Sequence, residues 1–186
     1  MKSALSLILW LIVLGVKSQS IDVLKQRLEV SDDQERPGIE NNIAEAYFVN
    51  KKFKKATEYA KQAIVHAKST KNRSEELRGL INAGNASKKQ KKYNRAVGFF
   101  ENSLSLATEA KNSTLVSYAY ESMGYCFRSL KKYNQAIVSY QKALSSSAKK
   151  GTKKAAVYAQ IAYCNFAISE LKEAIEYYEK ANDVYA

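Results

Sequence analysis

The phrase Lys131-Lys132-Tyr133-Asn134-Gln135-Ala136 is one of three similar phrases in this sequence. The other two are Lys51-Lys52-Phe53-Lys54-Lys55-Ala56 and Lys91-Lys92-Tyr93-Asn94-Arg95-Ala96, and Glu170-Leu171-Lys172-Glu173-Ala174 is a weaker fourth copy. The alanines of successive copies stand 40, 40 and 38 residues apart. A regular spacing of this size indicates a repeat array in which each repeat is one supersecondary unit.

Each phrase is predicted to open a helix. Four and seven residues after its alanine, bulky and small side chains fall on one helical face: Ala60 and Ala63, Phe100 and Ser103, Tyr140 and Ala143, Tyr178 and Ala181. A second amphipathic stretch precedes each phrase and carries a small residue that lets a paired helix approach closely: Ala44, Gly84, Gly124 or Ala162. The predicted unit is therefore a helix-turn-helix.

The composition favours the same fold and excludes several kinds of chemistry. Of 186 residues, 46% are hydrophobic and 26% charged, and seven glycines and one proline leave few helix breakers. One histidine and two cysteines cannot build a multi-histidine metal site or a disulfide framework. No Ser-His-Asp spacing surrounds His66, so we expect it at the surface or at the edge of the core. We therefore expect no enzyme activity, no metal and no cofactor.

The two cysteines, Cys126 and Cys164, fall at the same place in neighbouring repeats. Equivalent positions on adjacent stacked helices are about 8–10 Å apart, which is beyond the Cα separation that a disulfide tolerates. We therefore expect two small buried thiols.

The pattern resembles the tetratricopeptide repeat (TPR) family, and the third repeat is the best copy. The signature places of that family are occupied by Tyr120, Met123, Gly124, Phe127, Tyr133, Ala136, Tyr140 and Ala143. The other repeats depart from the pattern at Ser87, Ser103 and Asn165, and no repeat has the closing proline. The resemblance implies an all-α, TPR-like solenoid over residues 34–186, with about four long-period repeats near residues 37–72, 75–112, 115–150 and 153–186.

The N-terminal segment predicts export. Residues 1–18 carry Lys2, thirteen largely apolar residues from 4 to 16 and a small-residue exit, which is the pattern of a signal peptide. A membrane-spanning helix needs about 20 apolar residues, so we expect no span after cleavage and a periplasmic or secreted protein. Residues 19–33 are predicted to form a capping helix, with 31–33 as the N-cap of the next helix and Pro37 in its first turn.

The long repeat, together with the export signal, resembles the extracytoplasmic segment of certain bacterial histidine kinases and regulators, and it implies a sensor-input or scaffold role. In the TPR family the first helix of each repeat lines a groove that binds a protein or peptide partner. The corresponding residues are Asn41, Glu45, Phe48, Arg78, Asn85, Lys88, Tyr118, Glu121, Tyr125, Arg128, Tyr163 and Phe166. The alternative is that some first-helix residues, Ile81 and Phe166 above all, pack between repeats.

The formal charge of +12 concentrates in lysine-rich clusters at the turns inside the repeats, near residues 51–55, 88–95 and 128–132. The alternative function is therefore a polyanion-binding envelope protein that uses a lysine-rich edge. Nucleic acid is not expected, because no nucleic-acid-binding motif accompanies the charge. At the C-terminus we expect Ile175, Tyr177 and Val184 to lack an internal partner, so the last repeat is predicted to form a homodimer or to dock on a partner.

Overall fold

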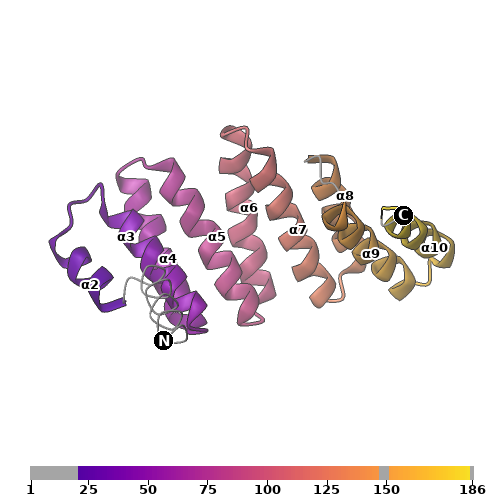
Figure 1. The fold of residues 1–186 in the computed structure, drawn as a ribbon, viewed down its shortest axis with the longest axis horizontal. Helices are drawn as coiled ribbons and strands as arrows, with labels where there is room; N and C mark the ends of the chain where they lie inside the picture. The colour runs from indigo at the N-terminus through magenta and orange to yellow at the C-terminus, as the bar shows by residue number, and fades with distance from the viewer. Residues whose placement is uncertain (1–20, 147–150, 185–186) are drawn as a thin grey trace, which may run out of the picture. The chain divides into compact units, whose positions relative to one another are not determined.

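The computed structural model describes residues 21–146 and 151–184, which contain helices and turns and no strand. In chain order the helices are α2 (Ile21–Val30), α3 (Arg36–Val49), α4 (Phe53–Ser69), α5 (Arg73–Lys89), α6 (Tyr93–Glu109), α7 (Ser113–Ser129), α8 (Tyr133–Ser146), α9 (Thr152–Ala167) and α10 (Leu171–Asn182) (Figure 1). The all-α prediction is confirmed. The predicted signal peptide lies outside the described residues, and the predicted domain and repeat boundaries stay predictions.

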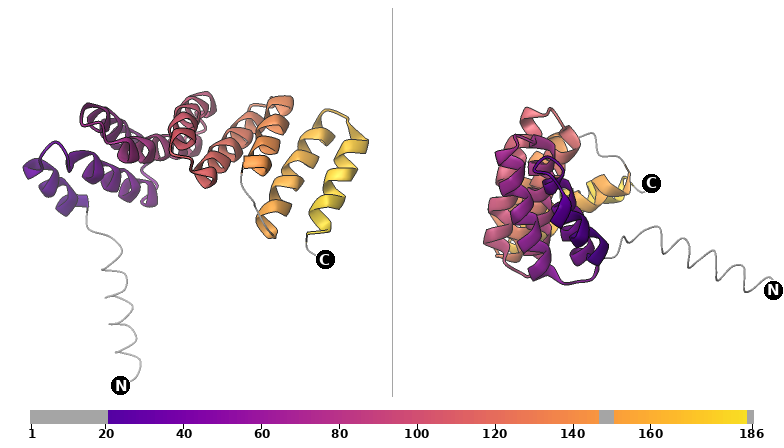
Figure 2. Two further views of the ribbon diagram at one scale, coloured as in Figure 1. Left: turned by 90° about the horizontal axis from the view of Figure 1, so that it is seen from above. Right: turned by 90° about the vertical axis from the view of Figure 1, so that its left-hand side faces the viewer.

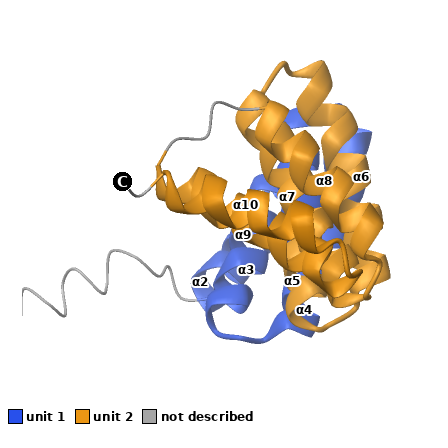
Figure 3. Cartoon of the chain, turned by 90° about the vertical axis from the view of Figure 1, so that its right-hand side faces the viewer, with its two compact units in different colours: residues 1–82 blue, residues 83–186 orange. Residues whose placement is uncertain are grey.

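The chain divides into two compact units, residues 1–82 (unit 1) and residues 83–186 (unit 2), and the division falls inside α5 (Figure 3). In unit 1, α3 packs against α2 and α4. In unit 2, each helix from α6 to α10 packs against the next one along the chain. The short turn between α9 and α10, the two yellow helices of Figure 2, reverses the chain direction.

Two glycines bring the helices of unit 2 together. A Cβ atom on Gly84 would lie 2.7 Å from Phe100 Cε1, and one on Gly124 would lie 2.8 Å from Tyr140 Cδ1. Both rings are almost completely buried. Any side chain larger than hydrogen would displace them, so the predicted close approach at both glycines is confirmed.

The turns between helices share one backbone form that favours glycine, yet a lysine occupies it five times. Lys51, Lys71, Lys91, Lys111 and Lys131 have φ between 52° and 59°. At the first of them, the Lys51 amide donates to the Phe48 carbonyl at 2.9 Å and the Lys52 amide donates to the Tyr47 carbonyl at 2.9 Å. The same two bonds recur at the other four turns. They form the paired Schellman pattern, which satisfies the last carbonyls of each helix.

The entry into α3 differs in detail from the prediction. Pro37 stands in the first turn as expected. Asp32 Oδ1 accepts hydrogen bonds from the amides of Gln34 (2.9 Å) and Glu35 (2.8 Å), so it closes the turn before the helix. The N-cap is Glu35, whose side chain makes no capping bond. The predicted N-cap at residues 31–33 is therefore too early by two residues, because the Asp32 side chain stabilises a separate turn first.

The C-terminal helix presents a different apolar set from the one predicted. Ile175 is 59% exposed, as expected, but Tyr177 packs on the Tyr158 ring with centroids 6.0 Å apart, and its hydroxyl accepts a hydrogen bond from Gln141 Nε2. Tyr178, predicted to lie on the packing face, is 48% exposed. Its counterparts Phe100 and Tyr140 are buried because another helix covers them, whereas no described helix follows α10.

Candidate functional site

The predicted site residues all lie on the first helices of the predicted repeats. Four belong to unit 1, namely Asn41, Glu45, Phe48 and Arg78. Eight belong to unit 2, namely Asn85, Lys88, Tyr118, Glu121, Tyr125, Arg128, Tyr163 and Phe166. The two groups have different chemistry, and we describe each within its own unit.

In unit 1 an arginine is held by acceptors of its own fold. Arg78 Nε and Nη2 donate to the two carboxylate oxygens of Glu45 at 2.8 and 2.9 Å, and Nη2 also donates to Asn42 Oδ1 at 2.6 Å. Glu75 Oε2 lies 3.5 Å from Nη1. This two-pronged arginine–carboxylate geometry is the strong form of the ion pair. We call this set, with Asn41 and Asn82, the Arg78 network.

The electrostatics of the Arg78 network show that Arg78 and Glu45 stabilise each other's charged forms. Desolvation by itself would raise the pKa of the Glu45 carboxyl, but hydrogen bonds from Arg78 and Asn82 outweigh it and lower the pKa below its usual value. The hydrogen bond to Glu45 raises the pKa of the Arg78 guanidinium. A partner that approached either group would have to compete with the other, so this surface is poorly suited to bind a charged ligand.

Asn41 and Phe48 have structural positions. Asn41 is fully buried, and its Nδ2 donates to the carbonyl and to Oε2 of Glu75 at 3.0 and 2.8 Å. Asn41 therefore cannot reach a partner, and its placement on a binding surface is wrong, because the amide satisfies buried groups between α3 and α5. The half-buried Phe48 packs edge-on against Phe53 within its own helix pair.

In unit 2 cations and aromatic rings alternate across α5, α6, α7 and α9. Lys88 Nζ lies 5.5 Å from the ring centroids of both Phe100 and Tyr125. Arg128 Cζ lies 5.4 Å from the Tyr125 centroid and 5.3 Å from that of Tyr163. These five residues, Phe100, Lys88, Tyr125, Arg128 and Tyr163, form what we call the cation–aromatic ladder. Each such contact contributes roughly 0.5–2 kcal/mol, depending on how far it is desolvated.

The two cations of the ladder lie against aromatic rings, without a carboxylate in direct contact among the described residues. Neither Lys88 nor Arg128 makes an ion pair with a carboxylate among the residues that the structure describes. Lys88 Nζ has Ser122 Oγ at 3.5 Å, and burial lowers the pKa of the Lys88 amine. Arg128 Nε is buried with no hydrogen-bond partner. The Arg128 guanidinium also acts on the buried Tyr140 hydroxyl, where its hydrogen bond and charge oppose the effect of burial on the pKa of Tyr140.

The rings of the ladder are accessible at one side. Tyr125 is 40% exposed and Tyr163 43% exposed, and each is braced edge-on by the first residue of a second helix, Tyr93 or Tyr133. Phe166, one turn beyond Tyr163, is 61% exposed, so it does not pack between helices of the described chain. Large exposed aromatic side chains in a cluster usually mark an interaction surface.

Asn85, Tyr118 and Glu121 flank the ladder. The Tyr118 hydroxyl donates to Asn85 Oδ1 at 2.7 Å, and its ring packs edge-on against Phe100. This bond ties α5 to α7 beside Lys88. Glu121 contributes a negative potential that raises the pKa of Lys88 and so partly opposes the effect of burial.

Sequence reasoning missed some partners of these residues. Phe100 was assigned to the core alone, although one face of its ring meets Lys88. Asn42 and Asn82 were not placed beside Arg78. The sequence signal that could have found them is spacing. Arg78 and Asn82 follow Glu45 by 33 and 37 residues, which is close to one repeat period.

A second polar pair was also missed in unit 1. His66 Nδ1 lies 2.9 and 2.8 Å from the two carboxylate oxygens of Glu40, whose side chain is 2% exposed. His66 lies at the edge of the core, as expected. Desolvation raises the pKa of Glu40, although the hydrogen bond from His66 opposes this shift. A buried carboxylate thus depends on the chain's single histidine.

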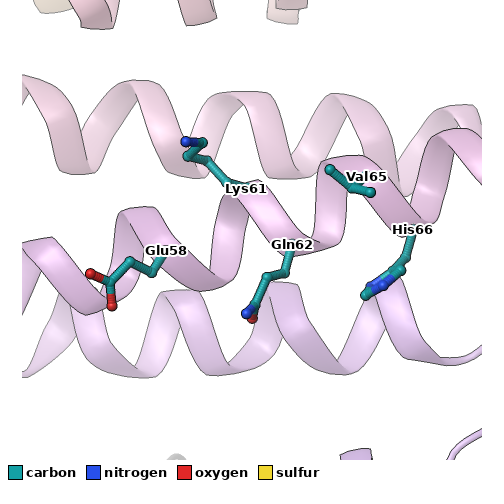
Figure 4. A pocket seen from close by; sticks show the side chains of 5 residues that line it. All are labelled: Glu58, Lys61, Gln62, Val65 and His66. Atoms are coloured by element: carbon teal, nitrogen blue, oxygen red, sulfur yellow. The ribbon is translucent and has the colours of Figure 1, made fainter.

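His66 also lines a shallow open pocket of about 360 Å³ together with Glu58, Lys61, Gln62 and Val65. Figure 4 shows that these side chains spread along one helix, α4, and do not converge on one point. Among the described residues no group of three or more His, Cys, Asp or Glu side chains could hold a metal ion. Cys126 and Cys164 are free and buried, as expected, and burial raises the pKa of each thiol to about 11. No described helix has the length and apolar character needed to cross a membrane.

Comparison with known families finds tetratricopeptide repeats in unit 2. The family model described as "Tetratricopeptide repeat" matches residues 117–150 and 155–186. No curated protein sequence matches the chain significantly. The two matched segments contain most of the ladder, including Tyr125, Arg128 and Tyr163.

Solved structures share the fold. The crystal structure of BtubC (BKLC) from P. vanneervenii has a TM-score of 0.79 and 16% identity, over 88% of this chain and 71% of that one. The apo form of RapI has a TM-score of 0.78 and 19% identity, over 88% of this chain and 47% of that one. MamA has a TM-score of 0.74 and 18% identity, over 89% and 86%. Residues 117–150 and 155–186 thus match the tetratricopeptide repeat model, and the chain has a TPR-like, all-α helical repeat fold.

Proposed function

We propose that this protein is a non-enzymatic scaffold or sensor-input module of the cell envelope that binds a protein or peptide partner through the cation–aromatic ladder. TPR scaffolds are suited to protein–protein interaction and are generally non-enzymatic. The observation that carries the proposal is the pair of cations, Lys88 and Arg128, which lie on exposed tyrosine rings and make no ion pair with a carboxylate of residues 21–146 or 151–184. Such a surface offers contact area at low entropic cost and donors for an acceptor-bearing segment.

The binding face is tested by selecting peptides against the purified protein from a random display library. Selected peptides should lose affinity for the variants Tyr125→Ala and Arg128→Ala by about tenfold or more, since aromatic and arginine side chains dominate such interfaces. Arg78→Ala is the matched control, because Arg78 is a first-helix arginine whose charge is already paired. Equal loss in Arg78→Ala, or peptides indifferent to all three variants, would contradict the assignment to the ladder.

Export and a sensor-input role are part of the same proposal and rest on residues 1–18 and on the resemblance described above. Trp10 is the only tryptophan of the chain. Cleavage after Ser18 would leave a mature protein with tyrosine emission alone. Intact-mass measurement on protein recovered from an envelope fraction tests this, and a mature species that retains residues 1–18 would overturn it.

A second candidate function is binding of an anionic envelope polymer or lipid along the lysine-rich edge. Three of the turns that end helices lie in the lysine-rich clusters, and each has a lysine, Lys51, Lys91 or Lys131, in a left-handed conformation that costs a non-glycine residue roughly 1–2 kcal/mol. In unit 2 the turn between α5 and α6 and the turn between α7 and α8 lie at the same edge of the helix pairs (Figure 1). Binding to a polyanion such as an anionic polysaccharide should weaken steeply with added salt, whereas peptide binding at the ladder should be much less sensitive.

We also propose that two copies of the chain associate through the C-terminal repeat. The support is the apolar exposure at Leu171, Ile175 and Tyr178. This association is separate from partner binding at the ladder and can be tested with the purified protein alone.

A further inference from the structure

The strongest unexplained surface of the described chain is one face of α10. Leu171, Ile175 and Tyr178 are 57%, 59% and 48% exposed, and their spacing of four and three residues places them in one stripe along the helix. Asn182, four residues further, continues the stripe and is also exposed. We call these four residues the α10 stripe.

The neighbouring repeat shows what this stripe is shaped to contact. The repeat phrase aligns Ala174 with Ala136, so Leu171, Ile175 and Tyr178 correspond to Tyr133, Ile137 and Tyr140 of α8. Those three side chains pack in one cluster with Val157, Ile161 and Cys164 of α9. The α10 stripe therefore has the register of a helix-packing face, and among the described residues nothing covers it.

The charges beside the stripe are self-complementary. Lys172 and Glu179 flank it on its solvent side, seven residues apart, and neither makes an ion pair within 4 Å among the described residues, although the charge of Lys172 helps to lower the pKa of Glu176 on the same helix. In an antiparallel pair of α10 helices, Ile175 of each copy faces Tyr178 of the other. With a rise of 1.5 Å per residue, Lys172 then lies within about 3 Å, along the helix axis, of Glu179 of the second copy. The two-fold axis makes the contact twice.

A parallel pair lacks this exchange. The opposite flank of the stripe is formed by Ala174 and Ala181, which are buried against α9, so Lys172 would face no acidic group. Charge complementarity thus favours a second copy of α10, in the antiparallel orientation, as the partner of the stripe. We propose that the α10 stripe is a homodimer interface in which two α10 helices pair antiparallel, with Lys172 of each copy against Glu179 of the other. This inference deepens the proposed self-association through the C-terminal repeat and rests on it.

The expected strength is low. A seam of one 12-residue helix per copy buries less than the roughly 1,200–2,000 Å² of a stable specific interface. We therefore expect a transient dimer, with a dissociation constant of roughly 10–1,000 μM. Sedimentation equilibrium of the purified protein, over about two decades of concentration around these values, should show a monomer–dimer equilibrium.

Charge reversal tests the orientation. Lys172→Glu and Glu179→Lys should each weaken self-association at least about tenfold, because both contacts become repulsive. An equimolar mixture of the two variants should recover dimer, since each chain then offers the charges that the other lacks. Glu173→Lys reverses an exposed charge on the face of α10 opposite the stripe, so it is the matched control and should dimerise like the wild type. Unchanged far-ultraviolet circular dichroism establishes that each variant is folded.

The contrary outcomes separate the two proposals. A wild-type protein that stays monomeric at every concentration overturns both the proposed self-association and the antiparallel seam. A wild-type dimer that tolerates both single reversals keeps the self-association but removes the seam from α10. Single variants that dissociate without recovering when mixed exclude the antiparallel orientation.

Discussion

The first-helix faces of the two units differ in how their arginines are held. In unit 1, Arg78 is neutralised by Glu45 and further fixed by Asn42. In unit 2, Arg128 lies between the rings of Tyr125 and Tyr163 and meets no carboxylate of the described residues. In the same fold, Arg78 therefore stabilises the packing of its own helices, whereas Arg128 lies against solvent-exposed rings. Position on a repeat does not by itself define a binding residue; the partners supplied by the neighbouring helix do.

The largest effect is expected where unit 2 depends on close helix approach. Gly124→Leu should unfold unit 2 or lower its unfolding free energy by about 1–3 kcal/mol or more, because the new side chain meets the buried Tyr140 ring. Tyr125→Ala, at the next residue, should keep its helicity. Thermal melts followed by circular dichroism compare the two. Equal loss of helicity in both variants would show that the ladder is part of the packing seam.

The next effect belongs to unit 1. His66→Ala leaves the buried Glu40 carboxylate without its hydrogen-bond partner, and should cost about 1–3 kcal/mol near neutral pH. Chemical denaturation at several pH values measures it.

The pH dependence has a definite sign. Because the folded-state pKa of Glu40 is raised, its contribution is most favourable below the ordinary carboxyl pKa and is lost as pH rises through the raised value. His66→Ala removes the group that opposes this shift, so its cost should grow with pH. Glu40→Gln should reduce that growth, and a cost of His66→Ala that is independent of pH would contradict this account.

A smaller effect should separate the two arginines directly. Arg78→Ala should lower stability by about 1 kcal/mol, because it removes the ion-pair partner of Glu45, and both side chains of that pair are partly exposed to solvent. The pKa of Glu45 is lowered in the folded state, so the lost stabilisation is present above the ordinary carboxyl pKa and disappears as pH falls through the lowered value. The effect of Arg128→Ala on stability should not decrease in this way as the pH falls. Parallel acid titrations of the two variants by circular dichroism test the contrast.

The smallest effect tests where the units are alike. Lys51→Gly in unit 1 and Lys131→Gly in unit 2 should each raise stability by about 0.5 kcal/mol, since glycine adopts the left-handed turn without the steric cost that lysine bears. Equal shifts in midpoint temperature are expected. A shift in one unit alone would show that the two turns differ in strain despite their shared hydrogen bonds.

Much of the fold could be predicted because its determinants are local and periodic. The alanine of each phrase and the glycines at 84 and 124 are visible in the sequence, and the structure places them where the helices meet. Whether Asn41 faces a partner or the core could not be predicted. That depends on Glu75, which lies on another helix 34 residues later. The exposure of Tyr178 could not be predicted for a related reason, because it depends on whether another helix packs on α10, and no described helix does.

The ladder could be predicted only in part. Lys88, Tyr125, Arg128 and Tyr163 were selected from their positions on the first helices, but the pairing of each cation with two rings is a property of the stacked helices. Sequence spacing gives the face on which a side chain lies. It does not give the distance between a guanidinium and the ring of the next repeat, and that distance distinguishes the surface of unit 2 from the salt-bridged one of unit 1.

The lysine turns with left-handed backbone conformation make deletion or duplication of whole repeats structurally simple. The turns at Lys91 and Lys131 have the same φ to within 1° and the same two amide–carbonyl bonds. A deletion or duplication of one 40-residue period therefore joins backbone that already has the correct direction and hydrogen bonding, and it needs no new loop. A change of 20 residues also joins like turns but exchanges first and second helices. Recombination by whole 40-residue periods therefore preserves both the turns and the order of first and second helices.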